Sequence, residues 1–223
     1  MKDKKLIVFD WNGTILADTL ACWKASNECL QFFDVEPISL ERYRETCHFP
    51  VIHFYKRNGA CVDSVLAKRE EANEIFYSAY TSLAKNARTR SGLRALLKWL
   101  DERGYDRTIL SNYVTPEIEK QLERLKIDHY FSHVCGNGNG HTVLEQTTKP
   151  KRLSDYMLKR GYHAENTWLI GDSIEEPEIA HKLGLKCISL SGGYFSTRRL
   201  KGANPHFLVH NMKDVIEILK NEC

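Results

Sequence analysis

The sequence predicts an α/β protein with a doubly wound parallel sheet and an inserted all-α domain. Short apolar runs typical of buried strands alternate with segments of helical periodicity over most of the chain. Residues 18–87 break this alternation, because they contain almost no strand-like run. A chain of 223 residues is long enough for one large domain and a smaller insertion.

The expected strands are short apolar runs separated by helical segments. Leu6–Phe9 is the first, and Asp10 follows it directly. Continuous runs of this kind are typical of strands that are buried on both faces of a parallel sheet. The later ones are Arg107–Leu110, Thr167–Ile170, Lys186–Leu190, His206–Val209 and a weaker run, His133–Cys135.

Helical periodicity fills the intervals between these strands. Thr115 and Pro116 are typical of a helix start, and Gly104, Gly161 and Gly184 are typical of helix ends. The expected apolar positions are Leu93, Leu96, Leu97 and Leu100; Ile118, Leu122 and Leu125; Met157 and Leu158; Ile179, Ala180 and Leu183; and Val215, Ile216 and Leu219.

The inserted block is expected to be a helical domain of residues 17–87. The surrounding α/β core domain then consists of residues 1–16 and 88–223. Within the insert, the pattern predicts helices over Thr19–Phe33, Leu40–Cys47, Val51–Asn58 and Asp63–Lys85.

Composition excludes several classes of partner. A formal net charge of +3 is too small and too dispersed to indicate a nucleic-acid partner. Seven cysteines without a Cys-x-x-Cys pair argue against a disulfide framework or a zinc site and favour a reducing compartment. Without a signal-peptide core or a membrane-length apolar stretch, the expectation is a cytoplasmic protein with no membrane partner. No pattern specifies an oligomeric state.

The first motif that indicates chemistry is Asp10-Trp11-Asn12-Gly13-Thr14, directly after the first strand. In a doubly wound sheet, ligands bind beyond the carboxyl ends of the strands. A carboxylate there serves as a nucleophile or a metal ligand, and Gly13 lets the chain turn sharply beside it. The alternative is a turn in which Asp10 only caps backbone amides.

Three further motifs follow later strands. Ser111 and Asn112 have donors for phosphate oxygens, and Lys149 before a proline can neutralise a phosphate or a carboxylate. Asp172 and Glu176, four residues apart, have the oxygen ligands that a hard cation prefers. Each motif also has an ordinary alternative: turn chemistry, a solvated lysine, or an acidic helix N-terminus.

Taken in order, the four motifs resemble those of the haloacid dehalogenase-like hydrolase superfamily, whose members are mostly phosphatases. The segment Glu176–Gly184 and the loop Gly192-Gly193-Tyr194 resemble its phosphoglycolate phosphatase-like branch, which carries a helical cap where this chain has its insert. The resemblance extends over nearly the whole chain.

The resemblance implies hydrolysis of a small phosphorylated metabolite through an aspartyl-phosphate on Asp10. It implies Mg²⁺ as the cofactor, with Asp10, the backbone carbonyl of Asn12, Asp172 and Glu176 as its ligands. Ser111 and Lys149 then act on the transferring phosphate. The complete set implied to contact the phosphate is Gly13, Thr14, Ser111, Asn112 and Lys149.

Asn12 departs from the family pattern, in which this position is an aspartate that acts as general acid and base. An asparagine amide cannot transfer a proton at neutral pH. Three outcomes follow: activity restricted to good leaving groups, a substitute acid such as Asp18 or a cap residue, or a phospholigand-binding protein without turnover. A further alternative is a phosphonoacetaldehyde hydrolase-like enzyme, but Lys56 does not match the lysine motif of that family.

Overall fold

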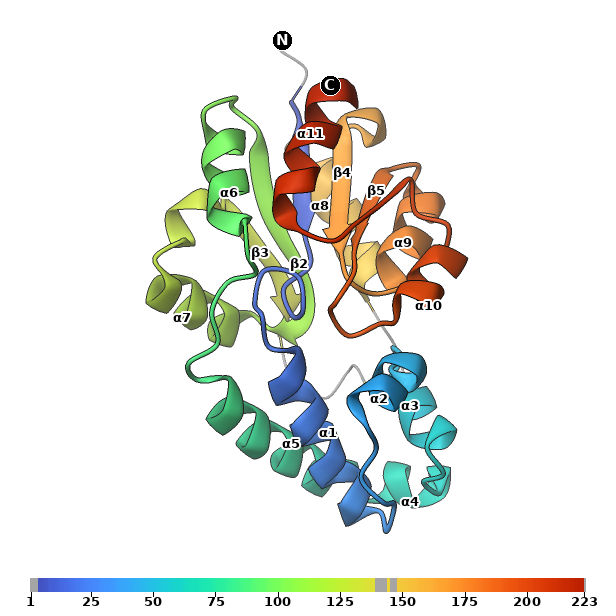
Figure 1. Ribbon diagram of the computed structural model, residues 1–223. Coiled ribbons are helices and arrows are strands. Elements are labelled where there is room, and N and C mark those ends of the chain that lie inside the picture. The colour runs from blue at the N-terminus through green and yellow to red at the C-terminus, as the bar shows by residue number, and fades with distance from the viewer. Residues whose placement is uncertain (1–3, 139–143, 145–147, 223) are drawn as a thin grey trace.

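The computed structural model describes residues 4–138, 144 and 148–222. Within them, six strands form one parallel sheet in the order β3-β2-β1-β4-β5-β6 (Figure 1). The chain winds outward in one direction from β1 and in the other from β4, which confirms the predicted doubly wound fold class. The strands are β1 Leu6–Phe9, β2 Asp106–Val114, β3 His133–Asn137, β4 Thr167–Gly171, β5 Lys186–Leu190 and β6 Phe207–Val209.

Helices cover both faces of the sheet, as the alternation of side chains along β1 requires. Ile7 and Phe9 belong to one apolar cluster and Leu6 and Val8 to another. The first cluster includes residues of α6 (Leu93–Asp101), α7 (Thr115–Leu125) and α11 (Met212–Glu222). The second includes residues of α8 (Lys149–Arg160) and α9 (Glu175–Leu183). The remaining core elements are α10 (Thr197–Gly202) and the 3-10 turns Asp128–Tyr130 and Ala164–Asn166.

The inserted helices lie beyond the carboxyl ends of the strands (Figure 1). They are α1 (Thr19–Phe32), α2 (Leu40–Thr46), α3 (Ile52–Arg57), α4 (Val62–Ala67) and α5 (Arg69–Ala84). They pack mainly around an apolar cluster distinct from the two that flank the sheet. We call residues 17–87 the cap and residues 1–16 and 88–223 the core, and we propose this division as the domain boundary.

The two connections between core and cap lie side by side. The amide of Ala17 donates to the carbonyl of Arg88 at 2.8 Å, and Leu16 and Thr89 form an antiparallel bridge. The chain therefore enters and leaves the cap at one place.

Two expected boundaries are wrong. β2 extends beyond Leu110 to Val114, and its register with β3 shifts between these two residues, so the second motif lies inside the strand. The helix expected over Asp63–Lys85 is two helices, because the backbone at Lys68 leaves the helical region with φ −109° and ψ 27°. Among the described residues, no helix is both long and apolar enough to cross a membrane.

Candidate active site

The strand-end motifs meet at one edge of the sheet. Asp10 follows β1 and Asp172 follows β4, and these two strands are neighbours. The amide of Asp10 donates to the carbonyl of Ile170 at 2.8 Å, so the first residue beyond β1 remains tied to β4. Lys149 is the first residue of α8, and its side chain reaches Asp10 at the same edge of the sheet. Asp10, Asn12, Lys149 and Asp172 line one cavity.

Lys149 is the centre of a buried ion network. Its ammonium donates to Asp10 Oδ1 at 2.7 Å and to Glu176 Oε1 at 2.8 Å, and it lies 3.4 Å from Glu175 Oε2. Burial alone would lower the pKa of Lys149, but the charges of these three carboxylates outweigh burial and raise it well above its usual value. Burial, together with the charges of Glu176 and Asp172, raises the pKa of Asp10. The edge therefore carries more negative charge than one lysine neutralises.

Asp172 is fixed by contacts on all sides of its carboxylate. Thr14 Oγ1 donates to Oδ1 at 2.7 Å, and the Tyr194 amide donates to Oδ2 at 2.6 Å. Two glycines make room for it, because a Cβ on Gly13 would lie 2.3 Å, and one on Gly193 2.0 Å, from Oδ2. Gly13 also has a φ of +74°, which side chains rarely adopt. Burial raises the pKa of Asp172 to about 7.

Asn12 is held by a second buried carboxylate, Asp18. Its amide donates to Asp18 Oδ2 at 2.7 Å and to the Tyr80 hydroxyl at 2.8 Å. Asp18 also accepts from the Gly13 amide at 2.7 Å, from Tyr80 at 2.6 Å and from the Tyr194 hydroxyl at 3.0 Å. These donors lie in the loop after β1, in α5 and in the loop after β5, so the hydrogen bonds of Asp18 connect the cap to the core.

The residues expected to contact phosphate fall into two groups. Lys149 and Asn112 line the cavity, although the Asn112 amide donates to Glu175 Oε2 at 2.9 Å. Ser111 is 1% exposed, and its hydroxyl accepts from the Tyr113 amide at 3.0 Å, which leaves its own hydrogen for another acceptor. Thr14 is fully buried and binds Asp172 instead of facing the cavity. We therefore assign Thr14 to holding that carboxylate.

Glu176 is buried beside Lys149 at the same edge. One of its oxygens accepts from Lys149, and the other accepts from the Ser173 amide at 3.1 Å and hydroxyl at 2.7 Å. Both oxygens are thus bound to protein groups. The longer glutamate side chain passes beneath Gly171, where a Cβ would lie 2.3 Å from Glu176 Cγ. Glu176 therefore holds Lys149 and the start of α9.

Sequence reasoning missed Arg90, Glu175 and Tyr80. Arg90 donates to the carbonyls of Gly13 at 2.8 Å and Ser191 at 2.7 Å, which ties two site loops together. It follows the second cap connection, and no strand-end motif marks it. Glu175 belongs to the fourth motif, but the acidic residue of the family pattern at the end of that motif corresponds to Glu176. Tyr80 lies in a helical repeat that looks like ordinary cap packing.

Loop contacts hold the cap against the core. Arg44 of α2 donates to the carbonyls of Gly193 at 3.0 Å and Gly192 at 3.1 Å. Arg199 donates to the Cys47 carbonyl at 2.6 Å and therefore anchors α10 to the cap. Lys56 is exposed and does not line the cavity, so it does not occupy the position that a Schiff-base lysine would need.

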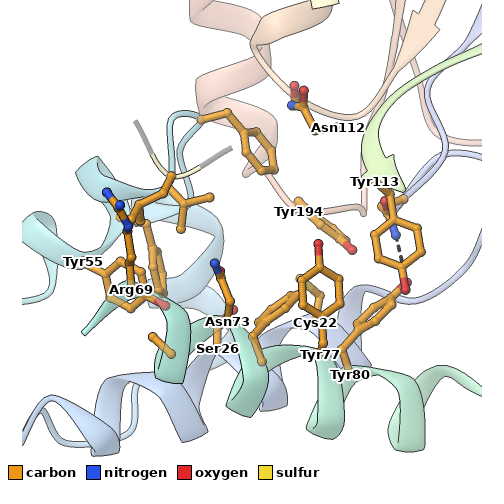
Figure 2. Close-up of a pocket in the computed structure, with 18 of the residues that line it drawn as sticks. Cys22, Ser26, Tyr55, Arg69, Asn73, Tyr77, Tyr80, Asn112, Tyr113 and Tyr194 are labelled. Carbon is orange, nitrogen blue, oxygen red and sulfur yellow. Dashed lines mark hydrogen bonds between the residues drawn. The ribbon is translucent and has the colours of Figure 1, made fainter. Parts of the chain in front are cut away.

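The cavity has a core end, where Asp10, Lys149 and Asp172 lie, and a cap end of mostly aromatic and aliphatic side chains that also includes Arg69, Asn73 and Ser26 (Figure 2). Tyr113, at the end of β2, packs edge-on against Tyr80 with ring centroids 5.5 Å apart. Phe76 and Tyr80 of α5 stack at 5.7 Å and 5°. Asn73 points from α5 toward the cavity in the same view. The cavity has a volume of about 140 Å³.

Comparison with known proteins agrees with this geometry. The family model described as haloacid dehalogenase-like hydrolase matches residues 7–190. A phosphoglycolate phosphatase of Pseudomonas fluorescens is 26% identical over 218 residues, which covers 95% of this chain and 78% of that protein. A haloacid dehalogenase-like hydrolase of Streptococcus pneumoniae superposes with a TM-score of 0.74 at 18% identity, covering 98% of this chain and 100% of its own. A hydrolase of Pseudomonas syringae gives 0.78 at 18% identity, covering 98% and 99%.

Proposed function

The chain belongs to the haloacid dehalogenase-like hydrolases, and on that premise we propose that it hydrolyses phosphate monoesters with Asp10 as the nucleophile. The observation that carries this proposal is the 2.7 Å contact between Asp10 and the buried Lys149 at the core end of the cavity. The phosphatase name of the Pseudomonas fluorescens relative supports the same class of substrate.

In the proposed reaction, an Asp10 oxygen attacks phosphorus and the ester oxygen departs with its bonding electrons. Water then cleaves the aspartyl-phosphate, which releases phosphate and restores the Asp10 carboxylate. Lys149 holds Oδ1 of Asp10 and therefore orients the attacking group. Its fixed positive charge also stabilises the transferring phosphoryl oxygens, and positioning with charge stabilisation provides most of the catalysis in phosphoryl transfer.

The residues at this edge fit a divalent cation. Asp10, Asp172, Glu175 and Glu176 outnumber the single lysine among them, and carboxylate oxygens are the ligands that Mg²⁺ prefers. We propose Asp10, Asp172 and the backbone carbonyl of Asn12 as the ligands. Bound there, Mg²⁺ would neutralise charge on the phosphoryl group. Thr14 and the Tyr194 amide keep the Asp172 carboxylate in place.

Asn12 limits the range of phosphate esters that the protein hydrolyses quickly. Its amide is engaged with Asp18 and Tyr80 and has no acidic proton for the departing oxygen. Asp18 does not replace it, because Asp18 is 1% exposed, lies behind Asn12 and does not line the cavity. We propose that turnover is efficient only when the leaving group departs without protonation.

Asn12 also favours a second candidate, a protein that binds phosphorylated ligands without hydrolysing them. The cavity and its cation-binding edge serve binding equally well. The two functions differ in one observable: the release of inorganic phosphate.

The test measures phosphate released from acetyl phosphate and from alkyl phosphates with Mg²⁺, for the chain and for Asp10→Asn. Asp10→Asn conserves side-chain size and removes the nucleophile. Release by the chain above the variant supports the phosphatase. Equal release by both, together with a thermal transition that rises with inorganic phosphate, supports the binding protein.

A further inference from the structure

The cap end of the cavity differs from its core end in a way that specifies the leaving group. Both acids among the described residues that line the cavity, Asp10 and Asp172, lie at the core end. The cap-end wall consists mainly of rings and aliphatic side chains, including Phe54, Tyr55, Phe76 and Tyr77, together with the polar Arg69 and Asn73. Because the cavity continues from Asp10 to this wall, the rest of an ester whose phosphate lies at Asp10 faces the wall.

We propose that the substrates are aryl phosphates, whose phenolic oxygen is the leaving group. This inference rests on the proposed phosphatase function. It names the chemical class of the ester and assigns the cap-end rings, above all Phe76, to recognition of its ring.

Most of the wall suits an apolar ring, although Arg69, Asn73 and Ser26 are polar members of it. Apolar surface of a ligand gains free energy when it leaves water for such a wall. Phe76 stacks on Tyr80 at 5.7 Å, and Tyr80 meets Tyr113 edge-on at 5.5 Å, so the wall is already a set of ordered ring contacts. Another ring extends this packing in the geometries that aromatic pairs prefer.

The chemistry at Asn12 selects the same class independently. Without an acid at this position, the ester oxygen must depart as an anion. A phenol titrates near pKa ~10, as tyrosine does, so a phenolate is a much weaker base than an alkoxide and departs without protonation. Ring recognition at one end and missing proton transfer at the other thus converge on a phenolic ester.

Four phosphorylated compounds separate the two requirements. Phenyl phosphate has a ring and a good leaving group, benzyl phosphate has only the ring, the anhydride acetyl phosphate has only the leaving group, and 2-phosphoglycolate has neither. With Mg²⁺ present, we expect the highest kcat/KM for phenyl phosphate. Benzyl phosphate should bind with a similar KM and a low kcat. Acetyl phosphate should show a high KM with appreciable kcat.

Two variants test the wall. Phe76→Ala should raise the KM for phenyl phosphate about tenfold and raise the KM for acetyl phosphate much less, and Phe76→Leu, which keeps apolar volume, should give an intermediate value for phenyl phosphate. Acetyl phosphate turnover reports on folding and chemistry in the same samples. Leu158→Ala is the surface control, because Leu158 is 84% exposed on α8.

The outcomes are distinguishable. If phosphate release from every compound equals that of Asp10→Asn, the proposed phosphatase function fails. If acetyl phosphate or 2-phosphoglycolate is hydrolysed while phenyl phosphate has no advantage, the function stands and the aryl assignment is overturned. The aryl assignment is also overturned if the Phe76 variants affect all four compounds equally.

Discussion

At the core end of the cavity, charged side chains are held by several partners each, whereas at the cap end ring faces contact one another. Lys149 binds two carboxylates within 2.8 Å, and Asp172 accepts hydrogen bonds on both oxygens. Phe76 and Tyr80, by contrast, meet through stacked rings. Removing one member of a buried charge network leaves its partners unpaired, while trimming a ring leaves its neighbours intact. Substitutions at the core end should therefore affect stability and chemistry together, and those at the cap end should mainly change ester preference.

The largest effect should come from Lys149→Met. The substitution leaves Asp10, Glu175 and Glu176 buried without their cation, so the free energy of unfolding should fall by about 3–5 kcal/mol. Phosphate release should also disappear. Lys151→Met on the same helix is the matched control, because Lys151 forms an exposed pair with Asp155 at 2.7 Å and should change stability by about 0.5 kcal/mol or less. Urea titration of both variants measures the two free energies of unfolding. Equal decreases in the two variants would contradict the expected contrast between buried and exposed charge.

Asn12→Asp should raise turnover of alkyl phosphates by about 10² to 10⁴ while changing aryl phosphates little. The new carboxyl would lie against Asp18, whose Oδ2 is 2.7 Å from the present amide nitrogen. Two carboxyls that close share a proton, and that proton supplies the missing acid. Initial rates on benzyl and phenyl phosphate measure the change. Fast and equal benzyl phosphate turnover by both proteins would show that Asn12 causes no proton-transfer defect.

A third expected effect concerns pH in the presence of a chelator. Burial raises the pKa of Asp172 to about 7 in the fold, above its value of about 3.9 in an unfolded chain. A group whose folded pKa is raised contributes stability at low pH and loses it as pH rises through the folded value. The free energy of unfolding should thus fall between about pH 4 and pH 7, and Asp172→Asn should flatten that decline. Urea midpoints measured across this pH range check the prediction, and a midpoint that rises with pH would contradict it.

The smallest effect should come from Tyr80→Phe, which removes one donor to Asp18 and keeps the stacked ring. The free energy of unfolding should fall by about 1.5 kcal/mol, the contribution of one hydrogen bond to a charged group. Tyr77→Phe, whose ring packs against Tyr113 at 6.1 Å, is the control and should remain within about 0.5 kcal/mol of the parent. Thermal unfolding of both variants decides whether the hydroxyl or the ring matters at this position.

The core was predictable from sequence because its strands have local signatures and two of them are followed by a recognisable acid. Asp10 and Asp172 meet because neighbouring parallel strands end at one edge, and Lys149 reaches them from the start of α8. The cap was less predictable. The break at Lys68 has no proline or glycine to mark it, and the Lys68 ammonium lies 5.4 Å from the ring of Phe32, a contact that exists only in the fold.

Several of the site details that sequence missed are long-range hydrogen bonds. Asp18 accepts from Tyr80 and Tyr194, which lie 62 and 176 residues away along the chain. Glu176 accepts from Lys149, which is 27 residues away. Short motifs identify which residue types approach the ligand, but they carry no information about which partner holds each one.

The paired connections between core and cap make the molecule modular. Because Ala17 bonds to Arg88 and Leu16 bridges Thr89, residues 17 and 88 form a ready-made junction for grafting. A foreign helical module with closely spaced termini could be spliced there without altering the sheet, because insertions are tolerated where both ends emerge together. A grafted module that keeps Asp18 and Tyr80, which hold Asn12, would carry new substrate preferences beside the same Asp10, Lys149 and Asp172, which is the combinatorial freedom that this architecture offers to protein engineering.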